Sequence, residues 1–203
     1  MRPSGATHPI RLWRIFPWDP TADPGEAFSN RSWAPRERQG AGRFDLPAQS
    51  AVLYLAETAA HGYAEVLQPY RTQILMRKFL RTRFFPLAHQ AIHVSAQLDA
   101  RIADLTDPAV LAEHGIRPDV LALPSWRGRA QTQTVALRLW NAGFAGLRWW
   151  SAFHGAWHTT ALFMERAAED DLIFRRPRPA TVKDPDVIEG ARAAGLRIRG
   201  DRA

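Results

Sequence analysis

Six stretches of the chain carry the hydrophobic pattern of β-strands. Ile10–Phe16 and Val52–Ala56 are short apolar runs, while Ala91–Leu98 alternates apolar and polar positions, as a half-buried strand does. Three more strands are predicted nearer the C-terminus, and the first two of them are joined by a turn at Gly155: Leu147–Ser151, Thr159–Met164 and Ile173–Arg176.

Helices are indicated between these strands by capping residues and by the residues that end them. Thr58 suits the N-cap of a helix over Ala59–Leu67, and a second helical stretch or its continuation is predicted over Pro69–Phe79. The pair Asp107-Pro108 starts another helix that ends near Gly115. Two further helices are predicted at Arg129–Trp140, ended by Gly143, and at Asp184–Ala194, closed by Gly195.

The connection from Pro17 to Gly42 has no regular pattern, because its prolines and glycines interrupt helices and strands. A connection of this length inside a compact domain is usually functional, and Phe28 and Trp33 give it side chains to pack with. We expect it to form a lid or a wall of the site. Strands and short helices interleave without regular βαβ units, so the sequence predicts a single-domain α+β fold around a mixed or antiparallel sheet.

The composition is that of one soluble globular domain. The chain has 203 residues, of which 46% are hydrophobic and 23% charged, enough to bury a core. It has no cysteine, which excludes disulfides, thiol catalysis and thiolate zinc sites. Its start has no apolar segment of signal-peptide length, and no run approaches the roughly 18 apolar residues of a spanning helix. We therefore expect a cytoplasmic protein without a membrane span.

The net charge of +7 comes almost entirely from arginine. Most arginines are scattered along the chain, which is typical of a general arginine bias. Two local groups, Arg71–Arg83 and Arg175–Arg178, instead favour an anionic ligand or an acidic partner.

The strongest chemical signal lies within Gly40–Leu67. Arg43 follows two glycines that let the backbone approach a ligand closely, and its guanidinium fork can clamp phosphate. Tyr54 lies in a buried strand, where its hydroxyl needs a partner. Glu65 lies on a largely apolar helix, where a carboxylate costs free energy unless it is paired or functional. Together these groups suit an anionic, sugar-containing substrate, because a carboxylate can stabilise positive charge on a sugar ring.

Each of these residues also has an ordinary structural explanation. Taken alone, Arg43 fits a surface salt bridge, Tyr54 a core position and Glu65 the solvent face of a helix. Glu57, at the end of the strand before that helix, is an alternative carboxylate for the site.

Histidines and serine supply further candidates. His89/His93 and His154/His158 are spaced as helical metal ligands, but the strand predicted over Ala91–Leu98 contains His93, and no glutamate completes a zinc motif. We predict no metal site; His154 or His158 could instead line the pocket beside Ser151. Ser151 ends a strand and lacks the glycines of a hydrolase nucleophile elbow.

Five segments in order, LWRIF, GRF, VLYLAET, HGYAEVL and GLRWWSAF, resemble the RES domain family. The family is named for an arginine, a glutamate and a serine, here Arg43, Glu65 and Ser151, and Arg14 matches an arginine of its first strand. Its members resemble ADP-ribosyltransferases in fold and are toxins of bacterial toxin–antitoxin systems. The resemblance implies an RES domain over residues 10–180, between a tail (1–9) and a C-terminal helix or tail (181–203).

The resemblance also implies the reaction, which is cleavage of the nicotinamide–ribose bond of NAD by phosphorolysis or hydrolysis. Arg14 and Arg43 would hold the pyrophosphate and ribose. Glu65 would orient the ribose and stabilise the cation, while Tyr54 and Ser151 would fix nicotinamide and its ribose. NAD is the substrate, so no cofactor is expected, and inorganic phosphate or water is the acceptor.

The resemblance to the family bears on the choice of glutamate and on the residues after Ser151. Glu65 is preferred to Glu57 because family members carry their glutamate inside this helix. Many members also carry an arginine shortly after the serine, whereas Ala152 and Phe153 follow Ser151 here, which leaves the details of phosphate binding open.

The implied partner is an Xre/ParS-like antitoxin in an oligomeric complex, with DNA reached only through the antitoxin. Two other functions are considered. One is an ADP-ribosyltransferase that modifies a protein through the same pocket. The other is a basic nucleic-acid-binding module that uses Arg71–Arg83 with Phe79, Phe84 and Phe85 as stacking residues, against which the scattered arginines and the lack of a known nucleic-acid motif count.

Overall fold

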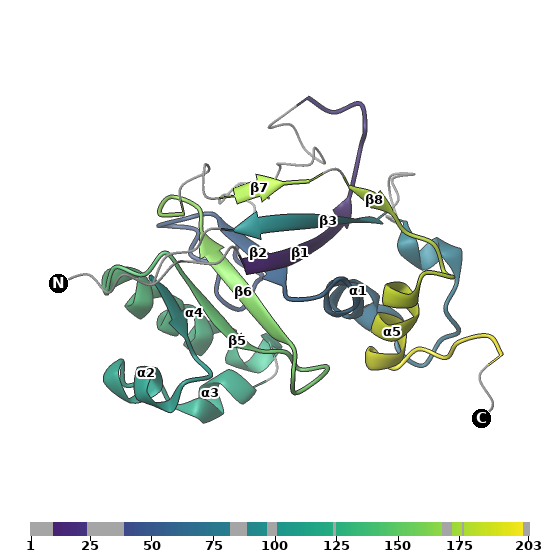
Figure 1. Cartoon of the computed structure of the whole chain (residues 1–203). Coiled ribbons are helices and arrows are strands. Elements are labelled where there is room, and N and C mark those ends of the chain that lie inside the picture. The colour runs from purple at the N-terminus through teal and green to yellow at the C-terminus, as the bar shows by residue number, and fades with distance from the viewer. Residues whose placement is uncertain are drawn as a thin grey trace.

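The computed structural model describes residues 10–23, 39–81, 89–96, 101–123, 125–167, 172–175 and 177–200, arranged as in Figure 1. Its strands are β1 (Ile10–Pro17), β2 (Val52–Ala56), β3 (His89–Ala96), β4 (Ile102–Asp104), β5 (Gly146–Trp150), β6 (His158–Phe163), β7 (Leu172–Phe174) and β8 (Arg178–Pro179). Its helices are α1 (Ala59–Leu67), α2 (Pro108–Glu113), α3 (Pro118–Ala122), α4 (Ser125–Asn141) and α5 (Pro185–Ala193), with 3-10 turns η2 (Gln68–Tyr70) and η3 (Arg77–Leu80) after α1.

The described strands form one sheet in the order β4-β5-β6-β2-β1-β3-β7, with β8 paired to β3. The β4–β5 pair is parallel, and the other pairs among these strands are antiparallel. The mixed sheet with flanking helices confirms the predicted α+β class.

A row of four side chains crosses the middle of the sheet. Trp13 on β1 pairs with Ala56 on β2, Ala56 with Thr159 on β6, and Thr159 with Trp149 on β5. Residues directly opposite each other in paired strands point to the same face. These four positions therefore define one face of the sheet, and two separate groups of helices pack on it.

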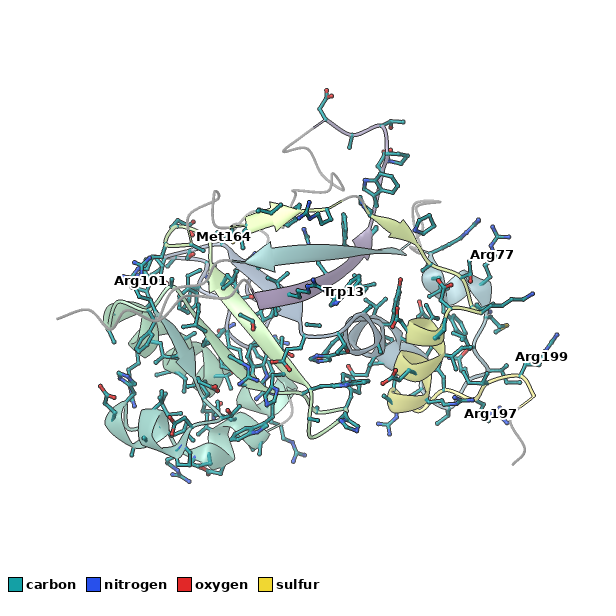
Figure 2. The ribbon with its side chains drawn as sticks, in the orientation of Figure 1. Trp13, Arg77, Arg101, Met164, Arg197 and Arg199 are labelled. Atoms are coloured by element: carbon teal, nitrogen blue, oxygen red, sulfur yellow. The ribbon has the colours of Figure 1, made fainter. Side chains whose placement is uncertain are left out.

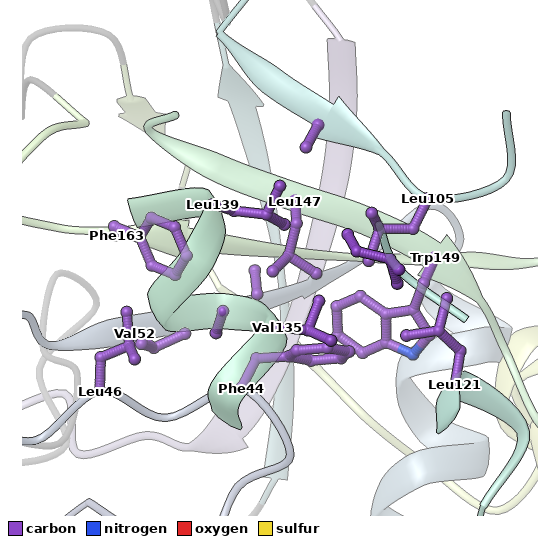
Figure 3. Close-up of a cluster of buried hydrophobic side chains, with 14 of the residues drawn as sticks. Phe44, Leu46, Val52, Leu105, Leu121, Val135, Leu139, Leu147, Trp149 and Phe163 are labelled. Carbon is purple, nitrogen blue, oxygen red and sulfur yellow. The ribbon is translucent and has the colours of Figure 1, made fainter. Parts of the chain in front are cut away.

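The first group, α2 to α4, covers the β4, β5, β6 and β2 part of this face. Val135 and Leu139 of α4 are buried against Leu147 of β5 and Phe163 of β6, as Figure 3 shows. Phe44, from the loop before β2, lies beside Trp149 in the same cluster, with ring centres 4.5 Å apart. This cluster anchors both the loop and the strand that reach the site.

The second group, α1 and α5, covers β1. Gly62 lets α1 lie directly on the sheet, because a Cβ there would stand 2.5 Å from Cγ1 of Ile15. The contact between α1 and α5 depends on Gly190 in the same way, since its Cβ would stand 2.4 Å from the carbonyl oxygen of Ala60. Figure 1 shows this pair of helices apart from α2–α4, with β5 and β6 running between the two groups.

The opposite face of the sheet is also apolar. Its buried side chains come from three neighbouring strands and pack against Trp18 and Met164: Leu12, Phe16, Leu53, Leu55 and Leu162.

Most of the predicted elements are confirmed. The strand over Val52–Ala56 and the helix over Ala59–Leu67 have the predicted bounds, and Thr58 caps that helix by accepting a hydrogen bond from the His61 amide at 3.0 Å. The short elements β4 and α3 were not predicted, because neither is long enough to show a period. Of the expected lid over residues 17–42, positions 24–38 lie outside the described residues.

The helical prediction over Pro69–Phe79 is wrong. Between η2 and η3 the chain is extended, and Thr72 has a φ of 71° that no helix contains. The segment instead pairs with the chain after α5, where the Leu75 amide donates to the carbonyl of Arg197 at 2.8 Å. A distant part of the sequence therefore overrides the local helix propensity.

We predict that Gly190→Ala weakens the α1–α5 contact. The added methyl group meets backbone atoms of α1, which cannot move aside, so the free energy of unfolding should fall by about 1–3 kcal/mol. Urea denaturation measures it. Gly155→Ala is the control, because a Cβ there meets nothing within 4 Å; equal stability of the two variants would contradict this account of the helix packing.

Candidate active site

A cavity of about 980 Å³ lies between the two helical groups. Its floor is the row of Trp13, Ala56, Thr159 and Trp149. Its walls come from α1, α3, the Gly42–Arg43 loop and the segment that follows β5. A volume of this size is at the upper end of small-molecule sites.

All five residues that the sequence singles out line this cavity: Arg14, Arg43, Tyr54, Glu65 and Ser151. They come from β1, β2, α1 and two loops. Arg71 and Gln68 also line it, just beyond the end of α1. The charged residues that line the cavity are thus three arginines and one glutamate.

A buried carboxylate fixes the loop that carries Arg43. Asp45 is only 4% exposed, and its Oδ2 accepts hydrogen bonds from the amides of Gly40 and Gly42 at 2.7 Å each. Its Oδ1 accepts one from the hydroxyl of Tyr54 at 2.8 Å. Three donors thus offset the desolvation of the carboxylate and hold the loop in one conformation.

The loop is also held from α4. The hydroxyl of Thr132 donates to the carbonyl of Arg43 at 2.5 Å, and the amide of Gln133 donates to the carbonyls of Gly40 and Gly42 at 3.1 and 3.0 Å. A Cβ on Gly42 would stand 2.3 Å from Oδ1 of Asp45, so the loop closes this tightly only with glycine there.

Arg43 is half-buried, and not all of its guanidinium N–H donors form hydrogen bonds within the described residues. Its Nη2 donates to the carbonyl of Leu121 in α3 at 2.6 Å. Its Nε is buried and has no partner among the described residues. Burial lowers the pKa of Arg43, and the charge of Glu65 opposes that shift. A guanidinium with an unused buried donor suits a bound anion.

Glu65 is the acidic group of the cavity. Its side chain is 49% exposed, and its Oε1 lies 3.5 Å from Nε2 of His61, one helical turn earlier. His61 is fully buried, stacks on Trp157 with ring centres 5.4 Å apart, and lies 3.3 Å from the hydroxyl of Thr159. Glu65 is therefore braced from one side while its carboxylate stays open to the cavity.

Glu57, the alternative carboxylate, is engaged elsewhere. Its Oε1 accepts from Nε and Nη2 of Arg148 at 3.0 and 2.7 Å, and its Oε2 lies 2.9 Å from Nδ1 of His158. Arg148 also donates to Asp104 at 2.8 Å. Strand alternation places Arg148 and His158 on the face opposite Trp149, and Glu57 does not line the cavity.

This ion cluster shifts the acidity of its carboxylates. Burial alone would raise the pKa of Glu57, but the hydrogen bonds from Arg148 and His158 outweigh it, so its pKa lies below the ordinary 4.5. Asp104 behaves in the same way, with Thr106 and Arg148 lowering its pKa against the effect of burial.

The Tyr54 hydroxyl is occupied. It donates to Asp45 and accepts from the Phe44 amide at 3.0 Å, and burial, with the charge of Asp45, raises its pKa well above the ordinary range. The Tyr54 ring lies edge-on to Trp149, with ring centres 6.2 Å apart. Because the hydroxyl is occupied, Tyr54 contributes its ring to the cavity lining.

Arg14 follows Trp13 on β1, and strand alternation turns its side chain toward Phe16 on the other face of the sheet, whereas Ser151 follows β5 at the cavity wall. The guanidinium carbon of Arg14 is 4.8 Å from the ring centre of Phe16, and burial lowers the pKa of Arg14 to about 10, so it stays cationic at neutral pH. The Ser151 hydroxyl accepts from the Phe153 amide at 3.1 Å, which leaves its own hydrogen to donate.

The histidines expected beside Ser151 do not line the cavity. His158 contacts Glu57, and His154 accepts from the Ala156 amide at 3.2 Å. In the part of the chain that the structure describes, no three acidic or histidine residues are grouped to hold a metal. Nor does any helix there have the length and hydropathy to span a membrane.

Sequence reasoning missed the residues that support the site. Asp45 was not singled out from the sequence, although an Asp after a glycine-rich turn often binds backbone amides. Thr132 and Gln133 gave no signal, since polar residues on a helix usually face water. Trp149 could have been placed from the period of β5, which puts it on the same face as Leu147.

A family model described as the RES domain matches residues 11–183. The chain is similar to a solved structure from M. tuberculosis, described as the crystal structure of the MbcT–MbcA toxin–antitoxin complex, with 21% identity and a TM-score of 0.59. That match covers 94% of this chain and 90% of the other. No curated protein matches the chain.

We predict that Glu57 stabilises the fold in a pH-dependent way. A lowered pKa means that the native state binds fewer protons, so this stability is complete above pH 4.5 and is lost as the pH falls through the native pKa. Glu57→Gln should cost about 1–2 kcal/mol at neutral pH and progressively less below pH 4.5.

Thermal and urea denaturation across this range measure the effect. Glu113→Gln is the control, because the Glu113 side chain is 74% exposed. A difference between Glu57→Gln and the wild type that persists unchanged in acid would rule out the ion cluster as its cause.

Proposed function

The chain belongs to the RES domain family, and from this premise we propose that it is the toxin of a bacterial toxin–antitoxin system that cleaves the nicotinamide–ribose bond of NAD. The family model and the fold shared with the MbcT–MbcA structure support the class of protein. The cavity supports the choice of substrate.

The observation that carries the proposal is the pairing of Arg43 and Glu65 around one cavity. Arg43 has an unused buried donor, which a diphosphate oxygen would satisfy. Glu65 would repel a simple anion but attract a cationic ring. NAD has both parts, a negative diphosphate and a positive nicotinamide ring, joined through ribose. A ligand with this charge pattern complements the cavity better than a uniformly anionic one.

The aromatic floor suits the flat parts of the same ligand. Trp13 and Trp149 lie in the cavity floor, and Trp150 and Phe153 line its wall. Aromatic faces stack on heteroaromatic rings and contribute about 1–3 kcal/mol per base in nucleotide complexes. Nicotinamide and adenine would occupy such surfaces.

In the reaction, the bond between ribose C1′ and the nicotinamide nitrogen breaks. The electron pair stays with nicotinamide, which leaves as a neutral molecule, while positive charge develops on C1′ and the ring oxygen. The Glu65 carboxylate stabilises this charge. An oxygen of water or phosphate then bonds to C1′, and the proton of water is released to solvent.

The other cavity residues position the substrate. Arg43 holds the diphosphate and its ribose, and Arg14 adds positive charge from the other side of the sheet. Ser151, with its free hydrogen, donates to the nicotinamide side of the substrate, and the ring of Tyr54 packs against it. Because the Tyr54 hydroxyl is bonded to Asp45 and Phe44, its second task is to hold the Arg43 loop in place.

The partner we propose is an antitoxin of the Xre/ParS-like type, which binds the toxin and restrains it. The similar structure from M. tuberculosis is itself described as a toxin–antitoxin complex, and this supports the assignment. DNA would be contacted through the antitoxin.

We predict that the purified chain, free of any partner, consumes NAD and releases nicotinamide. Liquid chromatography with mass spectrometry, with and without inorganic phosphate, identifies the second product. ADP-ribose shows hydrolysis, and its phosphorylated form shows phosphorolysis. Label from the adenine half appearing on protein would instead assign the chain as an ADP-ribosyltransferase.

The same activity should be visible in cells. Expression of the wild-type chain should lower cellular NAD and stop growth, and a Glu65→Gln chain at the same level should do neither. Unchanged NAD with a folded protein, both in the test tube and in the cell, would refute the proposal.

We predict different kinetic failures for the two charged residues. Glu65→Gln keeps the shape of the side chain but loses its charge, so kcat should fall by about 10²–10³-fold. Arg43→Ala removes charge-assisted bonds to the diphosphate, so KM should rise more than kcat falls. Steady-state kinetics of NAD consumption separate the two effects.

Matched variants control for charge and stability. Glu57→Gln loses a carboxylate outside the cavity, and Arg199→Ala loses an exposed arginine outside it; both should keep near-normal turnover. If Glu57→Gln abolishes turnover while Glu65→Gln preserves it, the assignment of the carboxylate is wrong.

A further inference from the structure

The arginine-rich segment after α1 has no place in the proposed reaction, apart from Arg71 at the cavity rim. The structure pairs this segment with the chain after α5. The Thr72 amide donates to the carbonyl of Gly195 at 2.8 Å, and the Arg197 amide donates to the carbonyl of Gln73 at 2.9 Å. Two segments far apart in the sequence therefore form one surface beside the cavity.

The backbone of this surface is held in a conformation that is not intrinsically favourable. Thr72 has a φ of 71°, which a β-branched residue rarely adopts and which costs about 1–3 kcal/mol. The hydrogen bonds to Gly195 and Arg197 maintain it. The arrangement after Thr72 is thus a defined strand-like edge rather than a loose loop.

Apolar side chains project outward from this edge. Leu75 is buried, whereas its neighbours Ile74 and Met76 are each 41% exposed, as expected for an extended segment whose side chains alternate. The carbonyl of Gln73 and the amide of Leu75 form hydrogen bonds with the backbone of Arg197. The amide and carbonyl of Ile74 point the other way, and the described residues offer them no backbone partner.

The charge around these two side chains has one sign. Arg77, Arg197 and Arg199 lie together at one end of the molecule in Figure 2 and are exposed. The sequence has no Asp or Glu over residues 66–98 or 190–200. Within the described part of the chain, none of these arginines forms an ion pair with a carboxylate. We define the basic–apolar surface as Arg71, Ile74, Met76, Arg77, Arg197 and Arg199.

We propose that the basic–apolar surface docks an acidic, extended segment of a partner protein. Carboxylates of that segment pair with the exposed arginines, its apolar residues cover Ile74 and Met76, and its backbone pairs with the open edge at Ile74. Methionine and arginine are enriched in protein interfaces, which fits this composition. The inference stands apart from the NAD reaction, because it needs no catalytic residue.

The same surface is poorly suited to other occupants. Phe79, expected to stack on bases, is 3% exposed and stacked on Tyr70 with ring centres 4.1 Å apart, so its face is not available to nucleic acid. Phe84 and Phe85 lie outside the described residues. A second copy of the chain would bring like charges together, which opposes self-association.

The test is direct binding of a fluorescent short peptide of alternating glutamate and valine, measured by anisotropy at low and moderate salt. A polyglutamate peptide of equal charge and a single-stranded oligonucleotide are measured as comparison ligands. The alternating peptide should bind about tenfold more tightly than polyglutamate. Binding should weaken by about tenfold in Ile74→Ser/Met76→Ser and in Arg77→Glu/Arg199→Glu.

Arg101→Glu is the control for charge, since Arg101 is exposed at the far end of the molecule in Figure 2; it should bind the peptide like the wild type. Thermal denaturation checks the fold of each variant. Equal binding of both peptides, or no loss in both double variants, overturns the proposal. Tighter binding of the oligonucleotide, lost in the same variants, would overturn it in favour of nucleic acid. Because NAD consumption is not measured, failure here leaves the proposed reaction untouched.

Discussion

The arrangement of the cavity depends on one buried carboxylate. Asp45 gathers the amides of Gly40 and Gly42 and the hydroxyl of Tyr54 within 2.8 Å. A carboxylate removed from water would be strongly destabilising without such donors, so the three bonds hold the loop in the conformation that supplies them. Arg43 emerges from this loop, and its position relative to Glu65 follows from that constraint rather than from its own contacts alone.

The pairing of the strands in the sheet forms the floor of the cavity. Trp13, Ala56, Thr159 and Trp149 lie side by side because four strands are paired at those positions. The same register places Arg148 and His158 on the opposite face, where they engage Glu57. One carboxylate is thereby committed to holding strand ends together, and the other, braced by His61, is left for the cavity. The two glutamates therefore have the same chemistry but different surroundings.

Much of this could be predicted from the sequence, for identifiable reasons. Thr58 and the apolar run before it defined β2 and α1, because local capping and periodicity determine those elements. Arg43, Tyr54 and Glu65 stood out as polar groups in apolar or glycine-rich surroundings. The extended path after Tyr70 could not be predicted, since it depends on hydrogen bonds to residues after α5. The choice between Glu57 and Glu65 rests on the family resemblance; in the structure Glu65 lines the cavity, while Glu57 is bonded to Arg148 and His158.

We propose above that the cavity holds NAD with its diphosphate at Arg43 and its nicotinamide ribose at residue 65. The most direct measurement is a crystal structure of the Glu65→Gln variant, which should turn over slowly, soaked with NAD. We expect the dinucleotide in the cavity, with a diphosphate oxygen within hydrogen-bonding distance of the Arg43 guanidinium and the nicotinamide ribose beside the substituted side chain at position 65. NAD bound elsewhere, or in the cavity with its diphosphate away from Arg43, would contradict it.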